Sequence, residues 1–167
     1  GMEEELKGYL SAFSHLSVRE VSGRDIVRDA SGREAAVVLD PTLLLTAEEW
    51  SAMAAKRTVQ GEYILCYCIS RSGALEPYIR RLAEDTGLPV VQLCGTRRKV
   101  HPKARMIFDA GPAEFLTLFQ NAAFVCTNSF HGTVFSVQFQ RPFFTAVAPA
   151  ELQEPERSRT FSLLSRL

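Results

Sequence analysis

The segment Asn128-Ser129-Phe130-His131-Gly132-Thr133 contains side chains that could do chemistry. It follows a short apolar run at 124–126 that is typical of a buried strand, and an apolar stretch with helical spacing begins within it. The pattern predicts that Asn128 or Ser129 caps this helix, whose first N–H groups then face the edge of a sheet, where an anion binds readily. His131 lies in the first helical turn, and its imidazole can serve as general acid or base near neutral pH. Gly132 allows another group to approach the backbone closely.

A purely structural interpretation of the same segment stays open. Ser129 would then only cap the helix, and His131 would pack against its neighbours or point into water. A single histidine does not define a site, so the residues alone leave both interpretations standing.

Basic residues form a second candidate. Arg97-Arg98-Lys99, followed by His101 and Lys103, comes directly after a strand predicted over 89–93. Such a cluster can bind a phosphate or an acidic sugar, or it can be a solvated basic loop.

Arg19 is a third candidate, because it follows a short strand predicted over 15–18. Its guanidinium could grip a carboxylate or phosphate at two points. The alternative is a surface ion pair with the adjacent Glu20, which would contribute little.

Helices and strands alternate along almost the whole chain, and this order must position the candidates. Helices are expected over 3–13, 23–29, 47–57, 75–86, 112–121, 130–139 and 161–167, and strands over 15–18, 35–39, 63–69, 89–93, 106–108, 124–126 and 143–147. Continuous apolar strands separated by helices indicate a Rossmann-like α/β fold with a parallel sheet covered on both faces. Ligands of such sheets bind beyond the carboxyl ends of the strands, where 70–73, 95–103 and 127–132 lie.

Local signals give more specific expectations. Ser22 is expected to cap the helix at 23–29, and Thr46 the helix at 47–57. Gly87 is expected to end the helix at 75–86. Asp40 should bond nearby backbone N–H groups and so fix a turn before Pro41. The strand at 35–39 is expected to be buried, and Trp50 with Phe135, Phe139, Phe143 and Phe144 to belong to the core.

Composition limits the function. The 167 residues include 19 basic and 19 acidic side chains, so no overall charge draws the chain to nucleic acid or to an anionic membrane. No apolar run reaches the roughly 18–20 residues that cross a bilayer. The cysteines Cys66, Cys68, Cys94 and Cys126 lie in apolar stretches with a single C-x-C pair, which predicts buried free thiols in a reducing compartment rather than a metal site.

An ordered series of segments resembles the polysaccharide pyruvyl transferases. The series consists of 16–20 (LSVRE), 38–44 (VLDPTLL), 63–67 (YILCY), 109–115 (DAGPAEF), 125–133 (VCTNSFHGT), 141–144 (RPFF) and 158–159 (SR). Each segment alone is a weak signal, but the ordered set covers nearly the whole chain. The resemblance implies a GT-B-like fold, in which two Rossmann-like domains face each other across a cleft, and transfer of a pyruvyl unit from phosphoenolpyruvate to a sugar hydroxyl.

The resemblance also implies roles for particular residues. His131 corresponds to the family's functional histidine, and Arg19 to an arginine that contacts the donor in some members. Asn128, Ser129 and Gly132 are then expected to bind substrate, and so is Arg159. Many members have arginine where this chain has Ser129. No cofactor and no metal are expected, and the implied partners are phosphoenolpyruvate and a saccharide acceptor in the cytoplasm.

Compared with the family, the chain matches only the later part. We therefore expect residues 1–45 to be a terminal strand–helix–strand piece and linker of an N-terminal domain, and 46–167 to be the C-terminal Rossmann-like domain. A chain lacking half of the cleft is expected to be inactive alone. Two other functions remain open: the C-terminal domain of a nucleotide-sugar glycosyltransferase, and a non-catalytic domain that self-associates, as a homodimer, through apolar surface near 43–45.

Overall fold

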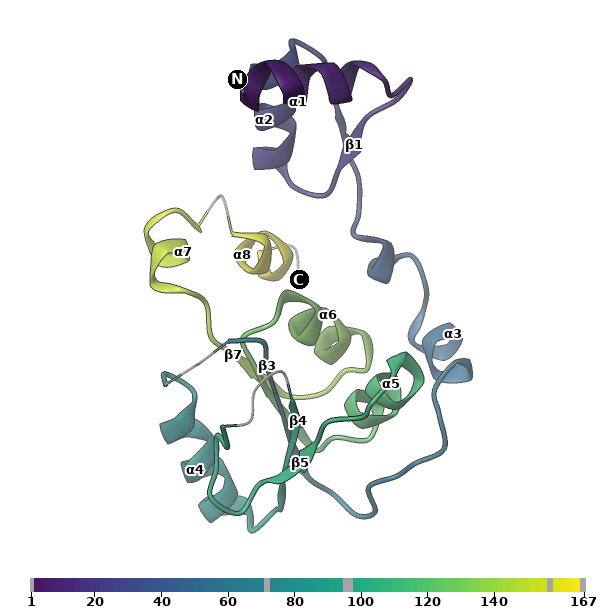
Figure 1. Ribbon diagram of the computed structural model, residues 1–167. Helices are drawn as coiled ribbons and strands as arrows, with labels where there is room; N and C mark the ends of the chain where they lie inside the picture. The colour runs from purple at the N-terminus through teal and green to yellow at the C-terminus, as the bar shows by residue number, and fades with distance from the viewer. Residues whose placement is uncertain (1, 71–72, 95–97, 156–157, 166–167) are drawn as a thin grey trace. The chain divides into compact units, whose positions relative to one another are not determined.

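The computed structural model describes residues 2–70, 73–94, 98–155 and 158–165 (Figure 1). The chain forms two compact units. One unit, here the N-terminal unit, runs to Leu44 and takes up the chain again from Ala150; the other, the sheet unit, spans Leu45–Pro149. Assignment of 1–45 and 46–167 to different domains of a GT-B-like protein stays a prediction.

The sheet unit is built on a parallel sheet of five strands in the order β5-β4-β3-β6-β7. The strands are β3 (Ile64–Cys68), β4 (Val90–Cys94), β5 (Arg105–Ile107), β6 (Phe124–Thr127) and β7 (Phe143–Thr145). In the central register, Cys66 lies opposite Gln92 of β4 and Cys126 of β6. The parallel α/β sheet expected from the sequence is therefore confirmed.

Helices cover both faces of this sheet (Figure 1). They are α3 (Ala47–Ala52), α4 (Glu76–Thr86), α5 (Pro112–Gln120) and α6 (Phe130–Gln138). Because side chains alternate along a strand, Leu65 joins the core beneath α5 and α6, while Ile64 and Cys66 join the core beneath α4. Both cores are apolar, which is why the strands read as continuous apolar runs.

Two predicted helix caps are confirmed. Thr46 and Glu49 form a capping box at the start of α3, in which Thr46 Oγ1 accepts from the Glu49 N–H at 3.2 Å and the Glu49 carboxylate accepts from the Thr46 N–H at 2.8 Å. Gly87 ends α4 with φ 68°. Helix α3 ends at Ala52, earlier than the predicted 47–57. Beyond this end, the Ala55 N–H donates to the Ala113 carbonyl at 3.0 Å instead of continuing the helix.

The N-terminal unit contains α1 (Met2–Ser11), β1 (Ser17–Val18), α2 (Val21–Ser31), β2 (Ala36–Val37), the 3-10 helix η1 (Pro41–Leu43) and, at the other end of the chain, α7 (Pro149–Gln153) and α8 (Arg159–Leu164). Strands β1 and β2 are parallel. The Arg33 guanidinium donates to the carbonyls of Leu10 and Phe13, so a cation binds the carboxyl end of α1. Neither η1 nor α7 was predicted.

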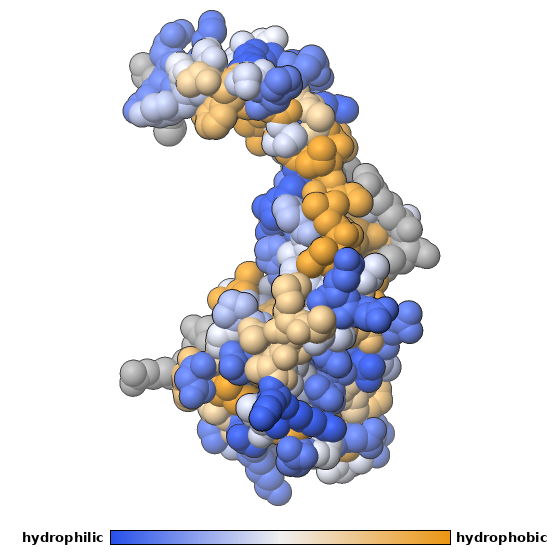
Figure 2. Space-filling view, turned by 90° about the vertical axis from the view of Figure 1, so that its right-hand side faces the viewer, coloured by the Kyte–Doolittle hydropathy of each residue, from blue (hydrophilic) through white to orange (hydrophobic). Residues whose placement is uncertain are grey.

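Two predictions for the N-terminal unit are wrong. Helix α2 begins two residues earlier than expected, so Glu20 is its N-cap and Ser22 lies inside the helix. The strand predicted as buried over 35–39 is confined to Ala36–Val37, because β1 offers only two residues to pair with. Val38 and Leu39 are 45% and 52% exposed, and apolar side chains reach the surface along this unit (Figure 2).

Cys66, Cys68 and Cys126 are free thiols buried against α4, as predicted, whereas the Cys94 side chain lies outside the described part of the structure. Burial raises the pKa of Cys68 to about 11. A hydrogen bond with the Cys126 side chain, together with burial, raises the pKa of Cys66 well above its ordinary value. Cys66 and Cys68 are therefore protonated in the folded chain at neutral pH.

Native thiols should consequently resist alkylation. At pH 8 a thiol with a pKa of about 11 has roughly 100-fold less thiolate than a thiol with an ordinary pKa. The thiolate is the form that reacts with alkylating agents. Iodoacetamide labelling of the tryptic peptide 58–71, which holds Cys66 and Cys68, should be at least about 100-fold slower in the native chain than in guanidinium. Equal rates in the two conditions would contradict the buried placement.

Candidate active site at the start of α6

Ser129 is the residue that caps α6. Its backbone is extended, with φ −100° and ψ 134°, and its Oγ accepts a hydrogen bond from the Gly132 N–H at 3.3 Å. The side chain is 4% exposed, so this hydroxyl belongs to the buried base of the helix start. Of the two caps that the sequence left open, the structure selects Ser129, and the positive end of the α6 dipole lies at the carboxyl edge of the sheet.

Asn128 joins two loops at that edge. Its Oδ1 accepts from the Ile69 N–H at 2.9 Å, and its Nδ2 donates to the carbonyl and hydroxyl oxygens of Ser70 at 3.1 and 3.0 Å. The amide therefore ties the end of β6 to the end of β3. Asn128 was predicted to bind substrate, and this stays a prediction. In the structure its side chain bonds Ile69 and Ser70, which follow β3.

Gly132 meets a close neighbour from its own chain. A Cβ at this position would lie 2.2 Å from Thr127 Oγ1 and 3.0 Å from Thr127 Cβ. Thr127 is itself fixed, because its Oγ1 donates to the Tyr67 carbonyl at 2.6 Å and accepts from the Ser129 N–H at 3.0 Å. The close approach expected at Gly132 is therefore explained by the packing of α6 on β6.

His131 is partly buried in the first turn of α6. Its ring lies edge-on to that of Phe130, with centroids 5.4 Å apart. Phe135 follows one helical turn later and shares the same helix face. The structure thus brings Asn128, Ser129, His131 and Gly132 together at one helix start.

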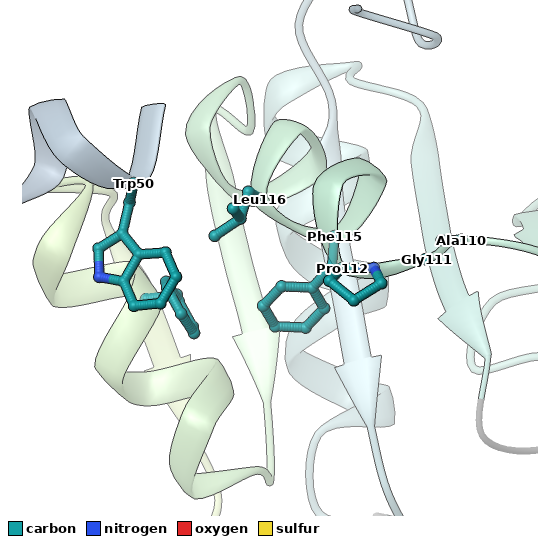
Figure 3. Close-up of a pocket in the computed structure, with 7 residues that line it drawn as sticks. Trp50, Ala110, Gly111, Pro112, Phe115 and Leu116 are labelled. Atoms are coloured by element: carbon teal, nitrogen blue, oxygen red, sulfur yellow. The ribbon is translucent and has the colours of Figure 1, made fainter. Parts of the chain in front are cut away.

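A hollow of about 440 Å³ opens beside that face (Figure 3). We call it the aromatic hollow; it is lined by Trp50, Ala110, Gly111, Pro112, Phe115, Leu116 and Phe135. Gly111 and Pro112 begin α5 after β5, which places the hollow toward the carboxyl edge of the sheet. Trp50 was predicted to belong to the core, and the hollow was not predicted, although the segment 109–112 follows a predicted strand and so lies at the ligand edge of the sheet.

The aromatic residues predicted as core divide into two groups. Phe135 and Phe139 are 6% and 5% exposed and belong to the core beneath α5 and α6, and Phe143 packs against it. Phe144 is 44% exposed and stacks on Tyr78 of α4, with ring centroids 6.2 Å apart. The prediction is wrong for Phe144, because β7 is an edge strand of the sheet and this side chain remains partly exposed beside Tyr78.

The basic loop after β4 is fixed by a buried glutamine. Gln92, 2% exposed, donates from Nε2 to the Arg98 carbonyl and accepts at Oε1 from the Val100 N–H, both at 2.9 Å. Arg98 also forms an ion pair with Glu76 at 3.4 Å. Arg97 lies outside the described residues. The carboxylate reduces the charge that Arg98 can offer an anion, which favours the interpretation as a structured surface loop.

Arg19 and Arg159 belong to the N-terminal unit. Arg19 Nη1 donates to the carboxylate of Asp40, which is 5% exposed and also accepts from the Thr42 N–H at 3.0 Å. The turn predicted at Asp40 is thus confirmed, with Arg19 as an additional partner. The expected Arg19–Glu20 pair is replaced, because Glu20 pairs with Arg159 at 3.6 Å. Both arginine side chains stay about 40% exposed (40% and 41%).

No group of three His, Cys, Asp or Glu side chains is arranged to hold a metal ion within the part of the chain that the structure describes. In the same residues, no helix is long and apolar enough to cross a membrane.

Comparison with known proteins identifies the relatives of this chain. The family model of the polysaccharide pyruvyl transferases matches residues 1–149, which include the whole sheet unit and the start of α6. The chain belongs to this family. No curated protein matches the chain.

A solved structure supports the fold of this polysaccharide pyruvyl transferase chain. The chain is similar to the Methanocaldococcus jannaschii UDP-GlcNAc 2-epimerase, solved in complex with UDP-GlcNAc and UDP, with a TM-score of 0.52 and 17% identity. The similarity covers 79% of this chain and 45% of the epimerase, so the chain spans less than half of that protein. At this identity the likeness confirms the Rossmann-like α/β fold and nothing about substrates.

Proposed function

We propose that this polypeptide transfers a pyruvyl group from phosphoenolpyruvate to a sugar hydroxyl during the synthesis of a cell-surface polysaccharide. The observation that carries the proposal is the start of α6. There a capped helix N-terminus and a partly buried imidazole share the ligand edge of a parallel sheet, in a chain of this family. The buried free thiols fit a reducing compartment, so we place the reaction in the cytoplasm.

Ketal formation defines the work of the site. One acceptor hydroxyl adds to C2 of phosphoenolpyruvate while the methylene carbon takes up a proton and becomes a methyl group. A second hydroxyl then replaces the phosphate at C2, its proton leaves with the phosphate, and a ketal and inorganic phosphate result. We assign these proton transfers to His131, since an imidazole can both give and take a proton near neutral pH.

The donor's negative charges need positive partners. The N-terminal end of α6 supplies one, and the Ser129 hydroxyl, which accepts from Gly132, retains its own O–H to donate. In the N-terminal unit, Arg19 and Arg159 are proposed as donor-binding residues on the family resemblance alone. Each already forms an ion pair within that unit, Arg19 with Asp40 and Arg159 with Glu20. Loss of the arginine that many relatives carry at position 129 makes these two arginines more important here.

Two other functions have some support. The second candidate is the C-terminal domain of a nucleotide-sugar glycosyltransferase, because such a domain would have the same Rossmann-like α/β fold that the likeness to the epimerase confirms. Exposed apolar residues in the N-terminal unit, among them Leu44 at 68%, favour self-association, and light scattering that gives a strict monomer would contradict a homodimer.

Ligand-dependent melting distinguishes the two donors. Phosphoenolpyruvate at tenfold its Kd should stabilise the polypeptide by about 1.4 kcal/mol, which raises the Tm by about 3–6 °C. UDP-GlcNAc at the same concentration should leave the Tm unchanged, and inorganic phosphate serves as the control for a bare anion. A shift with UDP-GlcNAc and none with phosphoenolpyruvate would support the nucleotide-sugar candidate instead.

A further inference from the structure

The aromatic hollow is not used by the donor chemistry described above. We propose that it binds an uncharged apolar group, an aryl or alkyl aglycone, attached to the saccharide acceptor. The acceptor assignment rests on the proposed function. The affinity of the hollow for an aryl or alkyl group does not.

The lining explains which ligands fit. Among the described residues, no charged side chain lines the hollow, whereas the aromatic rings of Trp50, Phe115 and Phe135 do. Phosphoenolpyruvate carries phosphate and carboxylate charges, and an apolar lining gives those charges no partner. A bare sugar ring would also lose water from its hydroxyls without gaining hydrogen bonds in return. An aryl or alkyl group has no hydrogen bonds with water to lose, and it gains free energy because its apolar surface is buried.

The walls of the hollow are held in place by the core. Phe135 and Leu116 are 6% and 5% exposed, whereas Trp50 and Phe115 are partly exposed. Phe135 packs edge-on against both Trp50 and Phe115, with centroids 5.2 and 5.4 Å away. The rings therefore keep their orientation without a ligand (Figure 3). A volume of about 440 Å³ also exceeds a packing void, which holds at most a few waters, and falls among small-molecule pockets of about 300–1,000 Å³.

The position links the hollow to the proposed chemistry. His131 and Phe135 are four residues apart in α6, so their Cβ atoms are separated by about 6 Å along one helix face. Gly111 and Pro112, at the start of α5, line the hollow toward the same carboxyl edge of the sheet. We therefore infer that a saccharide that presents a hydroxyl to His131 can place a substituent in the hollow that Phe135 lines.

The single tryptophan of the chain is a direct reporter, because Trp50 lines the hollow. We would titrate the polypeptide with 4-nitrophenyl hexosides, whose chromophore quenches a nearby indole, and with the matching methyl hexosides in competition. The aryl hexosides should bind at least about tenfold more tightly than their methyl counterparts. Equal affinity of the two series, or no quenching beyond that of free N-acetyltryptophanamide, would overturn the proposal.

A filling variant ties the binding to the hollow. Ala110→Phe places a ring inside it and should weaken aryl hexoside binding at least about tenfold, while Ala150→Phe, the same change at an exposed alanine of the other unit, should leave it unchanged. Unaltered binding by Ala110→Phe, with a normal melting curve, would place the ligand elsewhere and overturn the assignment. Aryl binding without pyruvyl transfer would reject the proposed function but not the hollow's affinity. Transfer to methyl and aryl hexosides at equal kcat/KM would leave the function and reject the aglycone.

Discussion

Replacing Gly132 with alanine should destabilise the sheet unit by about 3 kcal/mol. The new methyl carbon would lie 2.2 Å from Thr127 Oγ1, far inside any normal contact. Thr127 cannot turn away without losing its bonds to the Tyr67 carbonyl and the Ser129 N–H, each worth about 1 kcal/mol, and overpacking itself costs about 1–3 kcal/mol. The gain of up to about 1 kcal/mol from alanine's helix propensity is smaller than this sum.

A guanidinium titration followed by Trp50 fluorescence measures this loss, since the only tryptophan lies in the sheet unit. Gly73→Ala is the matched control, because a Cβ at Gly73 meets nothing within 4 Å, and it should change the free energy of unfolding by less than about 0.5 kcal/mol. If Gly132→Ala were as stable as Gly73→Ala, the close packing of α6 on β6 would be wrong.

This glycine also shows how far sequence reasoning reaches. The alternation of apolar runs and helices predicted the sheet unit and its site-bearing edge, because burial on both faces of a parallel sheet imposes that pattern. The pattern also predicted that Gly132 permits a close approach. It could not say which group approaches, because Thr127 reaches Gly132 only once the turn at Asn128 is formed, and that turn is held by Ile69 and Ser70 from a distant strand end.

Other features of the molecule depended on tertiary contacts that no local pattern encodes. The aromatic hollow arises because Trp50 from α3 lies beside residues of α5 and α6. The local sequence of α3 does not specify which helices pack next to it. Arg19 was singled out as a candidate ligand-binding residue, but its structural partner Asp40 is 21 residues away, and the sequence suggested the adjacent Glu20 instead. The apolar run at 35–39 indicated burial, yet only Ala35 is buried, and the two β2 residues that pair with β1 are themselves exposed.

Replacing His131 with alanine should lower the rate of pyruvyl transfer by about 10²–10⁴-fold, the usual contribution of a general acid–base group. The measurement is phosphate release from phosphoenolpyruvate and ketal formation on a saccharide acceptor, made with the polypeptide of the whole reading frame that contains this chain. His101→Ala is the matched control, since His101 lies in the loop before β5 rather than at the start of α6, and it should retain full activity.

Binding separates a chemical role of His131 from a structural one. If the imidazole transfers protons, His131→Ala should still bind phosphoenolpyruvate, because the α6 N-terminus and the Ser129 cap remain. The Kd obtained from the ligand-induced rise in Tm should then change by less than about twofold. The loss would then fall on kcat rather than on KM. His131→Gln should be no more active than His131→Ala, since an amide donates a hydrogen bond but does not exchange a proton near neutral pH. If His131→Gln restored activity, His131 would be a positioning residue. If His131→Ala kept near-normal turnover, His131 would have no part in the mechanism. The start of α6 would then be an anion site, and other residues would have to supply the acid and the base.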